Sequence, residues 1–297
     1  MPRPCAAVNS PAPNTRSDMD IAISAAELRA RVSAWRREGA SIGFVPTMGN
    51  LHQGHFSLVD LARRNADRVV ASIYVNPTQF GPSEDFERYP RTPEADRAGL
   101  IEHGCDLLFA PTAEVLYPFG TGTTVRVDVP VVSDPLEGAI RPGHFIGVAT
   151  VVAKLFNLVQ ADIAVFGRKD YQQLLVVQRM VADLCLPIEI VPAPIEREAN
   201  GLAMSSRNQY LTPDERVRAG AIYATLAEMQ RALQDGQSIS VVEAMAHEKL
   251  IAAGLEPDYA TVRRADDLRP PEGLGEERVA LIAARIGRTR LIDNLPA

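Results

Sequence analysis

Residues 42–55 of this 297-residue chain read IGFVPTMGNLHQGH, an apolar run that leads through a glycine-containing turn to two histidines. The short run Ile42–Val45 is apolar throughout, which predicts a buried strand. Apolar residues then recur at helical spacing over 56–66, which predicts a helix directly after the turn. Glycines let the backbone approach a ligand closely, and the free N–H groups of a helix start attract anions. The stretch therefore predicts a strand–turn–helix unit able to bind an anion.

The same alternation of strand and helix continues over the following residues. Further strands are predicted at 68–75, 106–110, 162–166 and 187–191, and further helices at 25–38, from Thr92 onward, at 145–158 and at 171–183. This rhythm predicts an α/β fold with a Rossmann-like, doubly wound parallel sheet and right-handed crossovers. In such sheets ligands bind outside the carboxyl ends of the strands. The loops that follow the strands are therefore the place to look for chemistry.

The pattern changes after about residue 193. Thr212-Pro213-Asp214-Glu215 is a strong helix start, and one long helix is predicted from it to about Leu233. A helix at 240–253 and strands at 258–262, 279–284 and 289–291 follow. Helices followed by strands predict a smaller α+β domain. We expect a flexible N-terminal extension at 1–20, a nucleotide-binding domain at 21–194 and a C-terminal domain at 195–297.

Composition excludes several classes of protein. Hydrophobic residues make up 46% and charged residues 23% of the chain, which are ordinary globular values, and the net charge of −6 gives no basic footprint for nucleic acid. The three scattered cysteines fit neither a disulfide framework nor a zinc knuckle. No apolar run approaches the roughly 20 residues of a membrane span, and 1–20 has no secretory core. We expect a cytoplasmic protein without nucleic-acid or membrane partners.

The loop after the strand at 42–45 ends in two histidines. His52 and His55 lie three residues apart near a helix start, so their rings face one side, where they can donate hydrogen bonds to phosphate oxygens. A bare pair at this spacing is more often two ordinary turn histidines. The strand, the glycine turn and the helix together favour the phosphate site. A zinc site is disfavoured because no cysteine or acidic residue lies nearby in the sequence.

Three more loops follow predicted strands or precede predicted helices. Asn76 and Gln79 follow the second strand and can fix a hydroxyl or carboxylate, although Asn-Pro alone indicates a turn. In 167–173, Lys169 is a cation suited to phosphate, but an ordinary helix start fits that segment equally well. Arg141 adds a further cation before the helix at 145–158, and His144 in the same loop fits a turn residue and a ligand equally well.

A further loop, MSSRN at 204–208, combines hydroxyls with Arg207, which can bind phosphate oxygens with two hydrogen bonds. No GxxxxGK[ST] sequence occurs, so the phosphates are not held as in a P-loop. No nucleophilic Cys or Ser/His/Asp order stands out. The set predicts nucleophilic attack on a nucleotide phosphate, governed by positioning and charge neutralisation.

Ordered motifs extend this interpretation to a family. The stretches are FVPTMGNLHQGH, YVNPTQF, YPRTPEAD, RPGHFIGVATVVAKLFNLVQAD, VFGRKDYQQL and EREANGLAMSSRNQYL, in order from residue 42 to 211, with TRLIDN near the C-terminus. They resemble the pantothenate synthetase (pantoate–β-alanine ligase) family, whose HxGH signature relates it to nucleotidyltransferases and class I aminoacyl-tRNA synthetases. The resemblance implies a Rossmann-like domain, a C-terminal domain that closes over the site, and a homodimer.

The resemblance also implies a reaction and its residues. Pantoate would attack the α-phosphate of Mg²⁺-bound ATP to give pantoyl adenylate, and β-alanine would then release AMP and pantothenate. The implied ATP contacts are Met48, Gly49, Asn50, Leu51, His52, Gln53, Gly54, His55, Gly167, Arg168, Lys169, Asp170, Glu196, Met204, Ser205, Ser206 and Arg207. Gln79 and Gln173 match the glutamines that hold pantoate, and Asn76 and Arg141 are further substrate-binding candidates. The expected catalytic residues are His55, His52, Lys169 and Arg207, and the metal ligands are unknown.

Three residues depart from the family pattern, and two alternative functions stay open. Asn50 and Gln53 stand where Ala and Glu are common, and Arg168 stands where Glu is usual. One alternative is another nucleotidyltransferase that shares the HxGH loop, although the other motifs do not suit it. The second is a nucleotide-binding protein without catalysis, which the change at Arg168 would explain.

Overall fold

The larger part of the molecule is built on one parallel sheet. The computed structural model describes residues 19–82, 84–273 and 275–297. Six strands lie in the order β1-β4-β3-β2-β5-β6, and all neighbours pair in parallel. Their bounds are β1 Asp20–Ala22, β2 Ile42–Thr47, β3 Arg68–Ile73, β4 Leu107–Phe109, β5 Ile163–Gly167 and β6 Glu189–Ala193. Every strand predicted before residue 193 is confirmed.

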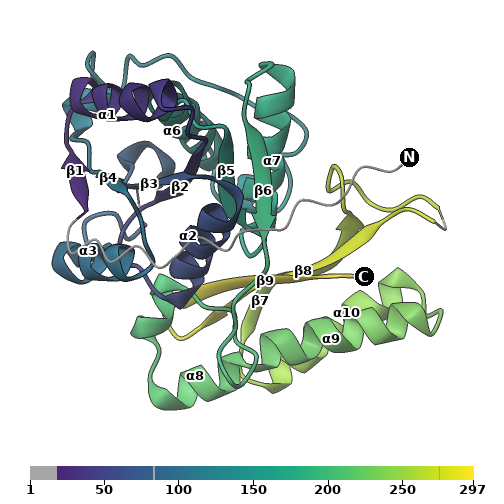
Figure 1. Ribbon diagram of the computed structural model, residues 1–297. Helices are drawn as coiled ribbons and strands as arrows, with labels where there is room; N and C mark the ends of the chain where they lie inside the picture. Colours follow the sequence, from purple (N-terminus) through teal and green to yellow (C-terminus); the bar gives the residue numbers. More distant parts are fainter. Residues whose placement is uncertain (1–18, 83, 274) are drawn as a thin grey trace, which may run out of the picture.

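Helices cover both faces of this sheet (Figure 1). The principal ones are α1 Ala25–Arg37, α2 Gln53–Asn65, α3 Pro93–Glu102, α6 His144–Val159 and α7 Tyr171–Asp183. Buried side chains of α1, α6 and α7 form one apolar cluster with Phe44, whereas those of α2 and α3 form another with Val45. Successive strand residues point to opposite faces, so neighbours in β2 enter different clusters. The predicted doubly wound fold is confirmed.

The centre of the sheet is a topological switch point. From β2 the chain proceeds to β3 and β4 on one side, and it later returns to place β5 and β6 on the other side. The loops after β2 and β5 therefore leave the sheet in different directions and open a crevice between them. This arrangement positions the candidate site.

The smaller part is a three-stranded antiparallel sheet with helices on one face. Its elements are η2 Ser206–Tyr210, α8 Pro213–Ala219, α9 Ala221–Gln234, α10 Ile239–Ala252, β7 Glu256–Arg264, β8 Arg278–Ile286 and β9 Thr289–Pro296. The strand order is β7-β8-β9. The sheet lies between the larger part and helices α9 and α10 (Figure 1). The predicted smaller α+β part is present.

The two parts contact each other through an apolar patch and a buried ion pair. Leu268, Val279 and Leu281 of the smaller part pack against residues of the larger part, among them Leu136, Tyr171 and Leu175. Arg290 on β9 donates two hydrogen bonds, of 2.6 and 2.7 Å, to the carboxylate of Glu137 in α5 (Glu137–Ile140). A two-bond arginine–carboxylate pair fixes orientation as well as distance. The smaller part is thereby held beside the carboxyl ends of the strands.

The structure corrects the N-terminal prediction at residues 19–20 only. The expected extension at 1–20 lies outside the described residues except at its end, where Met19 is 3% exposed and Asp20 begins β1. β1 pairs with β4 at the edge of the sheet. Three residues at an edge carry too little periodicity for recognition from sequence, because strand signals need four or more alternating residues.

The predicted long helix after Thr212 is two helices. The chain breaks between α8 and α9 at Gly220, whose N–H donates to Val217 O instead of Arg216 O. The side chain of Asn200 donates to that Arg216 carbonyl at 2.8 Å, so a residue outside the helix takes the acceptor that a continuous helix would use. In the described ranges, no helix has the length and apolarity needed to cross a membrane.

Candidate active site

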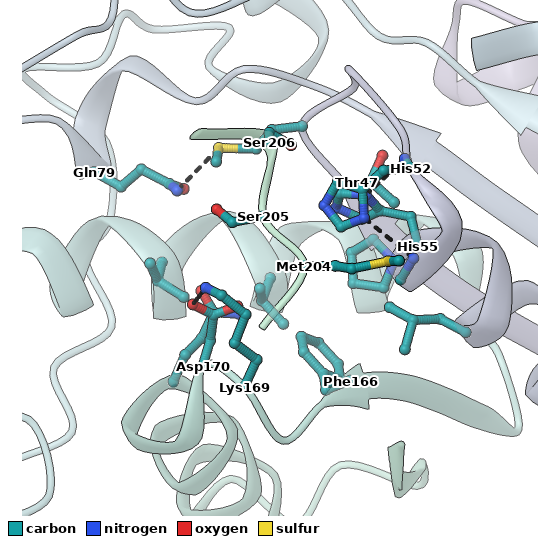
Figure 2. A pocket seen from close by; sticks show the side chains of 18 of the residues that line it. Thr47, His52, His55, Gln79, Phe166, Lys169, Asp170, Met204, Ser205 and Ser206 are labelled. Carbon is teal, nitrogen blue, oxygen red and sulfur yellow. Dashed lines mark hydrogen bonds and ion pairs between the residues drawn. The ribbon is translucent and has the colours of Figure 1, made fainter. Parts of the chain in front are cut away.

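A cavity of 240 Å³ opens where β2 and β5 end. Most of the predicted site residues line it, namely Met48, His52, Gly54, His55, Gln79, Arg141, Gly167, Lys169, Asp170, Gln173, Glu196, Met204, Ser205, Ser206 and Arg207. Figure 2 shows the two histidines on one side and Lys169 and Asp170 on another, with the segment that carries Met204 and Ser205 between them. The strand-end loops therefore converge as the parallel sheet predicts.

The loop after β2 turns sharply before it reaches the histidines. Gly49 has φ 83° and Asn50 has φ 51°, both in the left-handed region, where Gly and Asn cost least. The backbone N–H groups of Asn50 and Leu51 donate to the carboxylate of Asp96 at 2.9 and 2.7 Å. Asp96 is 2% exposed and lies on α3. A buried acid therefore holds the turn from outside the loop.

The two histidines are oriented by hydrogen bonds within their own loop. The Nδ1 atom of His52 accepts from the N–H of Gly54 at 3.1 Å, and the Nδ1 atom of His55 accepts from the N–H of His52 at 3.3 Å. Because Nδ1 is the acceptor in both rings, the proton of each neutral ring lies on Nε2. A Cβ on Gly54 would stand 2.9 Å from the ring of His52, so only glycine fits there. Each ring is left with an Nε2–H donor.

Both rings are neutral at neutral pH. Burial is the main cause that lowers the pKa of His52 to about 4, and Lys169 lowers it further. Burial likewise lowers the pKa of His55 to about 3, with the ring of His52 as the next cause. The ring centroids are 4.2 Å apart. In this state the pair presents two neutral hydrogen-bond donors, and positive charge at the cavity has to come from other residues.

That positive charge is supplied by Lys169 and Arg207. The Nζ atom of Lys169 lies 3.5 Å from Asp170, and Arg207 pairs with Asp85 at 3.0 Å. Burial alone would raise the pKa of Asp170, but Lys169 and Arg207 outweigh it, so the pKa is lowered and the carboxylate is ionised. Both cations line the cavity together with the histidines. The site thus joins two neutral donors and two cations around one space.

A buried amide network holds Gln79. The side chain of Asn76 donates to Gln79 Oε1 at 3.1 Å and to Gly147 O on α6 at 3.2 Å. Gln79 keeps its amide nitrogen toward the cavity, where it lies 3.1 Å from the sulfur of Met48. Asn76 is 1% exposed and does not line the cavity, so its place is behind Gln79. The expectation that Asn76 contacts substrate is corrected to a supporting position.

Arg141 and His144 form the opposite rim. Arg141 donates two hydrogen bonds to Glu84, at 2.7 and 2.6 Å, and a third to Nε2 of His144 at 3.1 Å. The Nδ1 atom of His144 donates to Gln79 O at 2.8 Å. Burial, reinforced by Arg141, lowers the pKa of His144 to about 4. Arg141 reaches the cavity but is engaged by Glu84, and His144 braces the loop of Gln79.

The remaining predicted residues lie at the edge of the site. Besides Asn76, five of them do not line the cavity, namely Gly49, Asn50, Leu51, Gln53 and Arg168. The side chains of Gln53 and Arg168 are exposed. Arg168 takes part through its backbone, whose N–H donates to Ala193 O at 2.9 Å. The departure from the family pattern at Arg168 therefore falls on an exposed side chain.

Sequence reasoning missed Tyr89 and Asp96 and left His144 open between a turn residue and a ligand. Tyr89 lines the cavity and is 6% exposed, and burial raises its pKa. His144 and Asp96 hold the loops of Gln79 and of Asn50 as described above. Tyr89 and Asp96 come from one stretch of the sequence and His144 from another. The only available signal was their position in the stretches YPRTPEAD and RPGH, which says nothing of contacts.

A crevice at the switch point of a doubly wound sheet, lined by backbone turns, neutral imidazoles and cations, defines an α/β nucleotide-binding enzyme of the HxGH type. The family model described as Pantoate-beta-alanine ligase matches residues 20–296. This chain belongs to that family and is a ligase.

Similar proteins extend over nearly the whole chain. A pantothenate synthetase from Xylella fastidiosa (strain M23) is 57% identical over 278 residues, which cover 93% of this chain and 99% of the relative. One from Xanthomonas euvesicatoria pv. vesicatoria (strain 85-10) is 57% identical over 268 residues, covering 90% and 96%.

Solved structures agree with the fold. The pantothenate synthetase of Thermus thermophilus has a TM-score of 0.87 at 49% identity, covering 93% of this chain and 99% of that chain. The pantoate-beta-alanine ligase of Francisella tularensis, solved in complex with beta-gamma ATP and beta-alanine, has a TM-score of 0.79 at 33% identity, covering 94% and 98%. The similarity therefore includes both parts of the molecule.

Proposed function

We propose that this chain condenses pantoate with β-alanine at the cost of ATP, through a pantoyl adenylate. The observation that carries the proposal is the cavity that unites His52 and His55 with the cations Lys169 and Arg207 and the amide of Gln79. Neutral donors and cations around one space suit a polyphosphate, and amides suit a hydroxy acid. Membership of the ligase family supports the same substrates.

In the first step a carboxylate oxygen of pantoate attacks the α-phosphorus of ATP. A new O–P bond forms, the bond from the α-phosphorus to the bridging oxygen breaks, and pyrophosphate leaves with that electron pair. The Nε2–H groups of His52 and His55 donate to phosphate oxygens, while Lys169 and Arg207 neutralise the charge that accumulates on them. Donors that are already oriented stabilise such charge without reorganisation. His55, the more buried ring, is the stronger catalytic candidate.

Pantoate is proposed to lie against Gln79 and Gln173. The wall beside these amides is apolar and includes Val148, Val151 and Val152 of α6. Pantoate carries two methyl groups on one carbon, which such a wall accommodates, while the amides bind its hydroxyl and carboxylate. The polar and apolar halves of the substrate therefore meet matching surfaces.

In the second step the amine of β-alanine attacks the acyl carbon of the adenylate. A C–N bond forms, the bond between the acyl carbon and the phosphate oxygen breaks, AMP leaves, and the nitrogen loses its proton. Water would destroy the mixed anhydride, so the site must be enclosed during this step. The segment Met204–Arg207 lines the cavity from one side, which makes it a candidate for the enclosing lid, together with the smaller domain to which it belongs.

Magnesium is proposed to enter with the nucleotide. Among residues 19–82, 84–273 and 275–297, no group of three or more His, Cys, Asp and Glu side chains could hold a metal ion. Magnesium commonly uses one or two carboxylates together with substrate phosphates, and the ionised Asp170 at the cavity fits that pattern. When bound, the ion would neutralise phosphate charge. We also propose that the protein is a cytoplasmic homodimer, on the family resemblance alone.

The test measures AMP formation from pantoate and ATP, with and without β-alanine. We expect stoichiometric AMP and pantothenate only when all three are present. Pyrophosphate release without AMP at saturating β-alanine would instead favour a different nucleotidyltransferase. Binding of ATP without any turnover would favour the non-catalytic alternative. Sedimentation at micromolar concentration tests the dimer separately.

A further inference from the structure

The sequence TRLIDN near the C-terminus belongs to no loop of the active site, yet its last two residues are buried beside it. Asp293 and Asn294 lie on β9 in the smaller domain, and each is 4% exposed. They line a small cavity of 40 Å³ together with Lys169 and Asp170. Two buried polar residues from the smaller domain therefore face the loop that carries a catalytic cation.

Asn294 holds the loop after β5. Its Nδ2 atom donates to the carbonyl oxygens of Arg168 and Lys169 at 2.8 and 3.0 Å. These carbonyls belong to two of the three residues that connect β5 to α7, and the side chain of Lys169 points into the active site (Figure 2). An amide that donates to two successive carbonyls fixes the orientation of the peptide between them. The direction of the Lys169 side chain depends on that peptide.

Asp293 holds the second cationic loop through Arg197. The guanidinium of Arg197 donates to the two carboxylate oxygens of Asp293 at 2.6 and 3.0 Å, and also to Gly201 O at 3.0 Å. Arg197 pairs with Ala203 in an isolated β-bridge at the base of a hairpin. The segment 205–207, which ends with Arg207, follows directly after this hairpin. The Arg197 guanidinium also lies 4.1 Å from the ring centroid of Tyr223 on α9.

We propose that Asp293 and Asn294 are positioning residues that set the spacing between Lys169 and Arg207 across the nucleotide phosphates. Adjacent residues of one strand hold two loops that are separated in the sequence, so the two cations share one rigid support. This inference rests on the proposed function, because it assigns the two cations to the phosphates of ATP. The pair touches neither the phosphates nor the reacting atoms and acts through the loops.

The first experiment measures binding of α,β-methylene ATP by calorimetry, in the full chain and without pantoate. Asn294→Asp keeps the size of the side chain but replaces both hydrogen-bond donors by an acceptor that faces two carbonyls. We expect its dissociation constant to rise about tenfold or more, since two buried bonds are replaced by repulsion. Val242→Ala in the core of α10, which is 0% exposed, is the control for lost stability in the same domain. Its dissociation constant should stay within about twofold of the parent value.

The second experiment asks whether Asn294 acts through Lys169. In a Lys169→Ala background, Asn294→Asp should weaken analogue binding less than about twofold, because the group that it positions is gone. A merely structural role would give the same loss in both backgrounds. Asp293→Asn, which keeps the side-chain size and weakens the bond to Arg197, is expected to raise the dissociation constant in the parent and to have no further effect in Arg207→Ala.

The outcomes separate this inference from the proposed function. If the parent binds the analogue and Asn294→Asp binds it equally well, the positioning role is overturned while the ligase function stands. Equal losses in the parent and in Lys169→Ala overturn it as well. If the parent fails to bind the analogue, both proposals fall. Background-dependent losses in the two pairs of variants support the inference.

Discussion

The two sides of the active site are organised in different ways. The loop that carries His52 and His55 fixes its rings by hydrogen bonds that span two or three residues. The loops that carry Lys169 and Arg207 are held by the smaller domain, through bonds that span 126 and 96 residues. The first side supplies neutral donors, and the second supplies the positive charge.

The two sides of the site therefore depend on different domains. The histidine loop belongs entirely to the larger domain, so its donors are formed whenever that domain is folded. Of the two cations, Lys169 lies on a loop that Asn294 of the smaller domain holds, and Arg207 belongs to the smaller domain itself. A closing motion of the smaller domain would therefore change the charge of the site more than its neutral hydrogen bonds. The following variants test the comparison, from the largest expected effect to the smallest.

Removal of the cation should be most damaging. Lys169→Ala is expected to lower the rate of AMP formation by about 100-fold to 1,000-fold with the fold intact, because the neutral histidines cannot replace its charge. The control is Lys249→Ala on α10, a residue that pairs with Glu228 away from the cavity. Turnover of Lys169→Ala within tenfold of the parent would contradict the assignment of the cationic side.

The histidine side is tested by a pair of substitutions. His55→Ala is expected to lower turnover by about 100-fold, the loss typical of one oriented donor. His55→Gln places an amide N–H near the position of Nε2 and should recover at least part of that loss, since the ring acts as a neutral donor. Steady-state rates at pH 7.5 measure both. If the Gln variant were as slow as the Ala variant, the role of a neutral donor would be wrong.

The buried imidazoles also predict how stability depends on pH. The pKa of His52 is lowered to about 4 in the folded state, below the value of about 6.5 in the unfolded chain. The unfolded state therefore binds more protons between these values, and the free energy of unfolding falls as the pH drops from about 6.5 toward 4. Between pH 7 and pH 5 this amounts to about 2 kcal/mol for one histidine.

The measurement is urea unfolding of the parent, His52→Gln and His247→Gln at both pH values. His52→Gln should lose less stability than the parent on going to pH 5, because it has no ring to protonate at that site. His247 is exposed on α10 and serves as the control. Identical pH dependence of the parent and His52→Gln would rule out a buried neutral ring in the folded state.

The smallest effect is expected at Arg168. Its side chain is exposed and outside the cavity, and only its backbone is held by β9. Arg168→Glu, which restores the residue usual in the family, should change the Michaelis constant for ATP and the turnover number by less than about twofold. A large gain of activity would revive the interpretation of this chain as a binding protein that has lost catalysis.

Much of the architecture could be predicted from local patterns. The strands of the parallel sheet appear as short apolar runs, and the helices between them show apolar residues at helical spacing. The convergence of the strand-end loops follows from that fold alone. The edge strand β1 and the break at Gly220 could not be predicted in this way. The first is too short for a pattern, and the second depends on the side chain of Asn200 from another segment.

The active site shows the same distinction between features set by local sequence and features set by distant residues. By itself, the sequence determined the loop of His52 and His55, because the glycine, the turn and the hydrogen bonds that orient the rings lie within a few residues of one another. Only the tertiary structure decided that Asp96 holds this loop and that Asp293 and Asn294 hold the loops of the cations. Partners so distant in sequence leave no local pattern, because the contacts of Asp96 and Asp293 exist only after their own domains have folded, and that of Asn294 only after the two domains have docked.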